Sequence, residues 1–169
     1  MTKRERRGAA AAGDIVITLE PEPADEVRWA VLAGLRAHNR LHAELPDFQP
    51  LVLAARDRDR QIVAALAGET AWQWLHVVSL WVDEAHRGRG LGRRLLRTAE
   101  DEARKRGVLR VYLDTLDFQA RPFYEREGYV VFGVQDDYPP GHQRFYMRKE
   151  LGRESTTGRT RAKIARRER

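Results

Sequence analysis

The stretch that most constrains the fold of this chain is HRGRGLGRR, at positions 86–94, which places three glycines among four arginines. It follows the apolar run VVSLWV and precedes a segment with helical periodicity, so it forms a strand-to-helix turn. A helix start exposes unpaired N–H groups and a partial positive charge, and glycines let another molecule's phosphates approach that backbone. The turn therefore predicts an anion site, although glycines also occur simply because tight turns need them. The side chains that can add charge-assisted contacts are Arg87, Arg89, Arg93 and Arg94.

The surrounding sequence alternates strand-like and helix-like segments. Apolar patterning predicts strands at 14–20, 50–56, 61–68, 72–82, 108–114, 129–134 and 144–150. Helical periodicity predicts helices within 21–45, where a short second helix ends near Leu45, and at 91–106 and 119–127. This order predicts a mixed sheet covered by helices, an α/β or α+β fold.

The two segments that flank the glycine turn have defined faces. Alternation along 72–82 places six side chains on one face: Trp72, Trp74, His76, Val78, Leu80 and Val82. The helix at 91–106 carries an apolar stripe of Leu91, Leu95, Leu96, Ala99 and Ala103. Opposite this stripe we expect acid-before-base pairs, Glu100 with Arg104 and Glu102 with Arg106, and Gly107 is the expected helix C-cap.

Length and composition limit the classes of function that this chain can have. At 169 residues the chain is long enough for one domain with a real core, and it has no cysteine, which excludes disulfides and thiolate chemistry. No apolar segment is long enough to span a bilayer, so we expect a cytoplasmic protein without a membrane partner.

The net charge of +6 sits at the two ends of the chain. Residues 1–13 carry +3 and residues 152–169 carry +5, which leaves −2 for residues 14–151. We expect both ends to be disordered basic extensions and 14–151 to be the folded domain. A folded part with this acidic balance disfavours specific nucleic-acid binding, although weak contact of the extensions with anionic partners stays possible.

Two well-known phosphate-binding motifs do not match this stretch. A dinucleotide-binding turn requires G-x-G-x-x-G, but Arg93 stands at the third glycine, and about 80 residues remain after the turn, too few for the two-half fold. The lysine motif of P-loop proteins is absent.

The stretch instead resembles the acetyl-coenzyme A loop of the GNAT superfamily of N-acetyltransferases. The family pattern is Arg or Gln, two residues, Gly, one residue, then Gly or Ala, and Arg87 to Gly92 match it in full. A second family signature is matched downstream, in ARPFYEREGY, by Ala120, Phe123 with Tyr124, and Gly128 with Tyr129. The resemblance covers roughly residues 15–151 and implies the GNAT fold, with a mixed, mostly antiparallel central sheet flanked by helices.

The resemblance also implies a donor and a set of binding residues. Acetyl-CoA would be the acyl donor, with its diphosphate on the glycine turn and its pantetheine arm beside the strand backbone at 80–82. The residues implied to bind it are Leu80, Trp81, Val82, Arg87, Gly88, Arg89, Gly90, Leu91, Gly92, Arg93, Asp117, Ala120 and Phe123. Asp117 departs from the asparagine that the family often has there, and a carboxylate can accept but not donate a hydrogen bond.

The resemblance places two candidate catalytic residues. Tyr124 occupies the position of the family's tyrosine and is the candidate general acid for the leaving thiolate, against a purely structural role packing helix on sheet. His76 lies where some family members place a base glutamate, and histidine titrates near neutral pH, so it is the candidate general base, directly or through water. A lone histidine in an apolar strand is more often a core residue. Glu69 and Asp114 are weaker candidates, and nothing indicates a metal site.

Aromatic and acidic residues suggest where the acceptor binds. Trp72, Trp74, Trp29 and His38 can line its pocket, although such residues are more often core. Asp136 and Asp137, before the last strand, favour a cationic acceptor.

We therefore expect an acetyl-CoA-dependent N-acetyltransferase in which an amine attacks the thioester directly, with a small-molecule acceptor favoured over a protein. The alternative within the fold is a non-catalytic acyl-CoA-binding regulatory module. Family members frequently dimerise, so a homodimer is possible, and the sequence names neither the acceptor nor the acyl chain beyond acetyl.

Overall fold

The computed structural model describes residues 15–20, 22, 24–44 and 46–152, and the chain divides into two compact units, Met1–Leu45 and Pro46–Arg169. Each unit is described by itself. The predicted disordered extensions, 1–13 and 152–169, lie outside the described residues except for Gly152.

The first unit contains helix α1, Asp25–Asn39. Asp25 and Glu26 lie in its first turn and Arg36 and His38 in its last, an arrangement that favours the helix dipole. The predicted strand at 14–20 was wrong: residues 15–20 form neither helix nor strand. An extended segment becomes a strand only where a neighbour pairs with its backbone, and the described part of this unit offers no second strand. The predicted second helix is replaced by hydrogen-bonded turns at 40–42.

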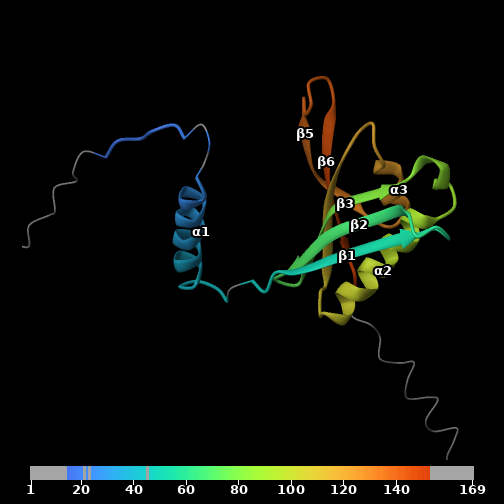
Figure 1. The fold of residues 1–169 in the computed structure, drawn as a ribbon, viewed down its shortest axis with the longest axis horizontal. Coiled ribbons are helices and arrows are strands. Elements are labelled where there is room, and N and C mark those ends of the chain that lie inside the picture. The colour runs from blue at the N-terminus through green and yellow to red at the C-terminus, as the bar shows by residue number, and fades with distance from the viewer. Residues whose placement is uncertain (1–14, 21, 23, 45, 153–169) are drawn as a thin grey trace, which may run out of the picture. The chain divides into compact units, whose positions relative to one another are not determined.

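The second unit is built on one six-stranded sheet in the order β1-β2-β3-β4-β6-β5. Its strands are β1 Gln49–Arg56, β2 Ile62–Ala71, β3 Trp74–Val82, β4 Arg110–Leu116, β5 Val130–Asp136 and β6 Gln143–Glu150. Only β3 and β4 pair in parallel, and all other neighbours are antiparallel, so the predicted mixed, mostly antiparallel sheet is confirmed. Figure 1 shows β1, β2 and β3 side by side, with α2 running across them.

Two predictions about the strand at 72–82 were wrong. Trp72 lies in a two-residue turn with Gln73, and both residues have left-handed backbone, at φ 47° and 64°. Such turns match the twist of the paired strands, here closing β2 onto β3. The predicted common face is also divided, because Ala67 pairs with Ser79 while Gly68 pairs with Val77, which leaves Val78 as an extra residue in β3. A bulge of this kind reverses the alternation, so Leu80 and Val82 pack against the core while Trp74 and His76 face away from it.

Helices α2, Leu91–Lys105, and α3, Arg121–Arg126, complete the second unit, with a 3-10 turn η1 at Glu84–His86. The apolar stripe of α2 is confirmed: Leu95, Leu96, Ala99 and Ala103 are buried in the core, and Leu91 packs against it. Gly107 caps the helix with φ 78°, and the amide of Val108 donates to the carbonyl of Ala103 at 2.9 Å.

Glu100 does not lie on the exposed surface predicted for it. It is 2 % exposed, and its carboxylate accepts hydrogen bonds from the Tyr129 hydroxyl at 3.0 Å and from Lys149 Nζ at 2.7 Å. A buried carboxylate is tolerated because these partners come from elsewhere in the fold, which helical spacing cannot show. Both predicted ion pairs form: Arg104 lies 3.7 Å from the buried Glu100 carboxylate, and Glu102 pairs with Arg106 on the surface at 3.2 Å.

Candidate active site

The bulge in β3 opens the sheet next to β4. The parallel pairing runs only from Trp74 with Arg110 to Val77 with Leu113, although β3 continues to Val82 and β4 to Leu116. Beyond this point the two strands separate and leave a cavity of about 830 Å³, which we call the cleft. Its lining comes from β3, the start of α2, the end of β4 and α3, and it comprises Val77, Val78, Ser79, Leu80, Trp81, Val82, Arg87, Gly92, Asp114, Thr115, Phe118, Gln119, Ala120, Phe123 and Tyr124.

Gly68 is required at the bulge. A Cβ built on it would lie 2.4 Å from the carbonyl oxygen of His76, closer than real side chains approach backbone. Strand β2 can therefore follow the bulged part of β3 only because residue 68 has no side chain.

The glycine turn presents the N-terminus of α2 to the cleft. Gly88 and Gly90 have left-handed backbone, at φ 71° and 75°, and Gly90 is the N-cap of the helix. Among the residues that the structure describes, no side chain caps this end, and its first turn holds no acidic residue, so its N–H groups and its partial positive charge can receive an external anion. The residues present therefore fit a diphosphate. Gly92, in the first turn, lines the cleft.

The arginines of the turn divide into different roles. Arg87 lines the cleft, and its Nε donates to the carbonyl of Val82 at 3.2 Å. Arg93 instead binds Glu127 at 2.6 Å, together with Arg97 at 3.3 Å. Burial acts to raise the pKa of Glu127, but the hydrogen bond and charge of Arg93, with those of Arg97, outweigh it and lower the pKa. The Arg93 side chain thus joins α2 to the residue that follows α3, and Arg93 is not among the residues that line the cleft.

The connection from β4 to α3 is held by side-chain hydrogen bonds. Gln119 Oε1 accepts from the Leu116 amide at 2.9 Å, and the Ala120 amide donates to Thr115 Oγ1 at 3.4 Å. Both contacts fold the chain back so that α3 presents Ala120, Phe123 and Tyr124 to the cleft.

Tyr124 is buried, at 6 % exposed, yet its hydroxyl makes no hydrogen bond with any of the residues that the structure describes. Burial, aided by the negative charge of Asp114, raises the pKa of Tyr124 to about 12. The phenol is therefore protonated at neutral pH and free to donate into the cleft.

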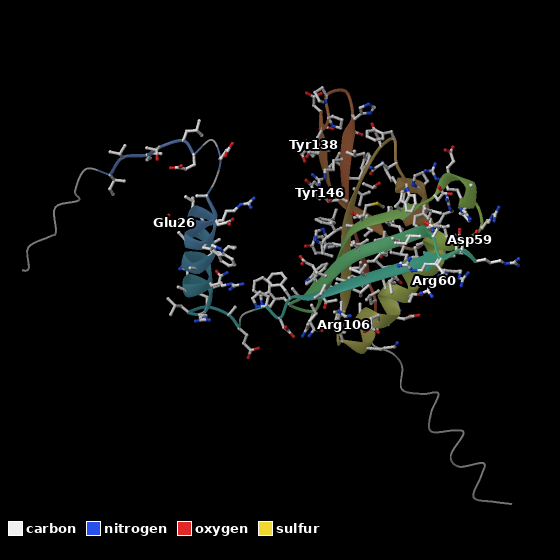
Figure 2. The ribbon with its side chains drawn as sticks, viewed as in Figure 1. Glu26, Asp59, Arg60, Arg106, Tyr138 and Tyr146 are labelled. Atoms are coloured by element: carbon white, nitrogen blue, oxygen red, sulfur yellow. The ribbon has the colours of Figure 1, made fainter. Side chains whose placement is uncertain are left out.

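Asp114, a weaker candidate base, lines the cleft but is held in an ion pair. Arg144 contacts its two carboxylate oxygens at 2.7 Å each. The guanidinium of Arg144 lies 5.1 Å from the ring centre of Tyr138 and 5.3 Å from that of Tyr146. Figure 2 shows both tyrosines on the β5–β6 hairpin.

Asp117 is not among the residues that line the cleft. Its carboxylate binds His142 Nδ1 at 3.0 Å and accepts from the Gln143 amide at 3.2 Å. These contacts join the β4–α3 connection to the start of β6.

His76 lies outside the cleft, in a neighbouring cavity of about 400 Å³. Its ring stacks on Tyr112 with centres 4.4 Å apart. The same cavity contains Trp72 and Trp74 from the predicted acceptor pocket. Trp29 and His38 lie on α1, in the unit that is described separately, and Asp136 and Asp137 lie exposed at the β5–β6 turn.

Comparison with known proteins places this geometry in a family. The model of the acetyltransferase (GNAT) family matches residues 18–129. The chain belongs to the GNAT acetyltransferase family. It is therefore an N-acetyltransferase whose acyl donor is acetyl-CoA.

Individual relatives agree with the family model. A blasticidin-S acetyltransferase of Streptomyces morookaense is 46% identical over 92 residues, which cover 54% of this chain and 68% of that protein. An acetyltransferase of Agrobacterium fabrum is 36% identical over 126 residues, which cover 75% of this chain and 92% of that protein. A crystal structure of an acetyltransferase from Bacillus cereus aligns at a TM-score of 0.73 with 26% identity, over 79% of this chain and 97% of that one.

Sequence reasoning missed part of the cleft of this GNAT enzyme. Val77, Val78 and Ser79 line it because of the bulge, and no residue pattern announces a bulge. Phe118 and Gln119 line it because the β4–α3 connection folds back, and their position beside the second family signature was the available signal. None of the helices within the described residues combines the length and apolar character needed to cross a bilayer.

Proposed function

We propose that this GNAT enzyme acetylates an amine of a small molecule in the cleft between β3 and β4. The observation that carries the proposal is that one cavity reaches both the uncapped start of α2 and the free Tyr124 hydroxyl. Acetyl-CoA, when bound, supplies an activated thioester. The amides that open α2, with Arg87, would hold its diphosphate, and Leu80, Trp81 and Val82 would lie along its arm.

The protein has to orient the amine and manage two protons. The amine nitrogen forms a bond to the acetyl carbon, the bond from that carbon to sulfur breaks, and sulfur keeps the electron pair. Tyr124 would give its proton to the departing sulfur. An alkyl amine with a pKa near 10 is only about one part in a thousand neutral at pH 7, which accounts for about 4 kcal/mol of barrier. Holding the reactants in line can supply more than that.

His76 remains our proposed base, through a water molecule, because it lies in the cavity next to the cleft. Asp114 lines the cleft itself, but both of its carboxylate oxygens are occupied by Arg144, at 2.7 Å each. A pH–rate profile of the His76→Ala variant tests the assignment. Loss of the acidic limb is expected, and an unchanged acidic limb would remove His76 from the mechanism.

The relatives support a small acceptor. Two similar proteins are named for blasticidin-S and streptothricin, and both names denote small molecules as acceptors. The deciding experiment measures thiol release from acetyl-CoA with a panel of amines that includes these two compounds. Release with some amine is expected. If acetyl-CoA raises the melting temperature but no amine in the panel causes release, the non-catalytic acyl-CoA-binding alternative is favoured.

The assembly and the location also remain proposals. We propose a homodimer, which sedimentation of the full chain tests, and a cytoplasmic location.

A further inference from the structure

The cavity that contains His76 has the composition of a site for an organic cation. Rings form most of its wall, and one carboxylate lies among them: the lining is Phe48, Glu69, Ala71, Trp72, Trp74, His76, Tyr112 and Phe132. We call it the aromatic cavity. Aromatic faces attract cations electrostatically, more strongly where water is excluded.

Glu69 is the charge that the aromatic cavity offers. It pairs with His76 across β2 and β3, so both side chains lie on the sheet face that points away from α2. It is half-buried and makes neither a hydrogen bond nor an ion pair with any residue described here. Together with burial, its charge raises the pKa of Tyr112 across the cavity. A half-buried carboxylate without a counter-ion favours a cationic ligand.

Two arginines already lie over aromatic rings of this face. Arg110 lies 5.4 Å from the ring centre of Trp74, and Glu150 neutralises it at 3.1 Å. Arg148 lies 5.8 Å from the ring centre of Phe132. Both guanidinium groups rest on aromatic rings, but neither forms an ion pair with Glu69, whose charge is left for a ligand.

The aromatic cavity adjoins the cleft along β4. Tyr112 lines the cavity, and Asp114, two residues further on the same face, lines the cleft. Two residues of a strand span about 7 Å. A molecule held in the cavity can therefore extend a second group to the place where the amine reacts.

We infer that the acceptor is a dication, a diamine or an amine with a guanidinium group. Its non-reacting cation binds in the aromatic cavity against Glu69, and its other amine enters the cleft. This inference rests on the proposed function and adds the acceptor's chemical class to it.

Steady-state thiol release from acetyl-CoA by the full chain, with two amines of equal length, 1,5-diaminopentane and 1-aminopentane, tests the inference, because only a molecule whose amine lies in the cleft reacts. The diamine is expected to have a roughly tenfold higher kcat/KM, the size of a partly desolvated cation–aromatic contact with a carboxylate behind it. Glu69→Gln should remove most of this preference. Asp59→Asn, an equal loss of charge at the exposed β1–β2 turn labelled in Figure 2, should keep it.

A second variant guards against misfolding. Trp74→Leu keeps every charge and removes one ring. It should lower kcat/KM for the diamine more than for the monoamine, and a cooperative melting transition shows that the variant is folded. Equal kcat/KM of the wild-type chain for both amines, or a full preference retained in Glu69→Gln, would overturn the inference. Binding of acetyl-CoA is followed separately by the melting temperature, so a failure of the proposed function is seen apart from a failure of the cation site.

Discussion

Tyr124 shows how one side chain can be packed and reactive together. Its ring lies against Phe123 and Tyr129, at 5.0 and 5.7 Å between centres, inside the core. The neighbouring Tyr129 has its hydroxyl bound to Glu100, whereas the Tyr124 hydroxyl is free of any such partner among the described residues. The hydroxyl of Tyr129 is thus already used in a hydrogen bond, whereas the hydroxyl of Tyr124 can donate to a bound molecule. Of the two tyrosines, only Tyr124 lines the cleft.

Replacing Tyr124 by phenylalanine should reduce kcat by about 10- to 100-fold, because thiolates leave readily and protonation gives only moderate help. The ring and its packing remain, so the melting temperature and the affinity for acetyl-CoA should change little. Steady-state thiol release and thermal unfolding measure both quantities. Full turnover with intact folding would show that Tyr124 is not the acid.

The pKa of Tyr124 makes a prediction about alkaline solution. It is raised from the ordinary 10.0 to about 12, so the fold favours the neutral phenol. The stability that this preference contributes is fully present at a pH below 10, the ordinary pKa of tyrosine, and is lost as the pH rises through the pKa in the folded chain, about 12. The acid should therefore stay available up to a pH of about 11. A pH–rate profile checks this, and an alkaline limb near pH 9 that disappears in Tyr124→Phe would contradict it.

At the scale of elements, the bulge in β3 creates the site. One extra residue, Val78, ends the pairing of β3 with β4, opens the cleft and reverses the face on which Leu80 and Val82 lie. The glycine turn then begins α2 at the edge of this opening. Strand, turn and helix act together, and each contributes backbone as well as side chains.

Gly68→Ala tests the bulge. The added methyl would meet the His76 carbonyl at 2.4 Å, so we expect a loss of about 1–3 kcal/mol in the free energy of unfolding, measured by denaturant titration. Gly133→Ala is the matched control in β5, where the new methyl would lie 3.6 Å from Tyr146, an ordinary contact. Equal stabilities of the two variants would show that the close approach at residue 68 is unimportant.

Gly92→Asp tests the anion site at the start of α2, with Gly92→Ala as its control. The Cβ of either variant would lie 3.6 Å from Val82 and 3.7 Å from Phe123, which are ordinary contacts, and the family pattern accepts alanine at this position. Gly92→Asp places a negative charge where the diphosphate would lie, while an acidic side chain in the first turn of a helix favours the helix dipole. We expect Gly92→Asp to keep its melting temperature and to bind acetyl-CoA more weakly by calorimetry, and Gly92→Ala to keep its affinity. An unchanged affinity of Gly92→Asp would show that the diphosphate does not bind at this turn.

At the scale of the whole molecule, the last described residues of the second unit are packed and hydrogen-bonded to the rest of that unit. Leu151 is buried, its amide donates to Leu109 at 2.8 Å, and Arg104 donates to its carbonyl at 3.2 Å. The basic residues after Gly152 carry much of the net charge. The residues that make the fold of the second unit and the basic residues that carry much of the net charge therefore lie in different parts of the chain.

Two truncations test this separation. A chain that ends at Gly152 should keep its melting temperature and its binding of acetyl-CoA. A chain that ends at Lys149 lacks the buried Leu151 and should melt at a lower temperature. Removing residues 1–13 and 153–169 together should abolish any retention on nucleic acid at physiological salt, because the rest of the chain is not basic. Retention that survives both deletions would place a basic surface on the folded part.

The sequence by itself determined the features that depend on local spacing. The glycine turn, the apolar stripe of α2, the Gly107 cap and most strands follow from neighbouring residues, and the two family signatures placed Tyr124 on its helix. Only the tertiary structure decided which distant groups meet. Two of these are contacts between residues far apart in the chain: Asp114 with Arg144, and the buried Glu100 with Lys149. Two others depend on how strands pair: the bulge at Val78 and the position of His76 outside the cleft. Their physical reason is strand register and long-range side-chain contact, and neither leaves a periodic pattern along the sequence.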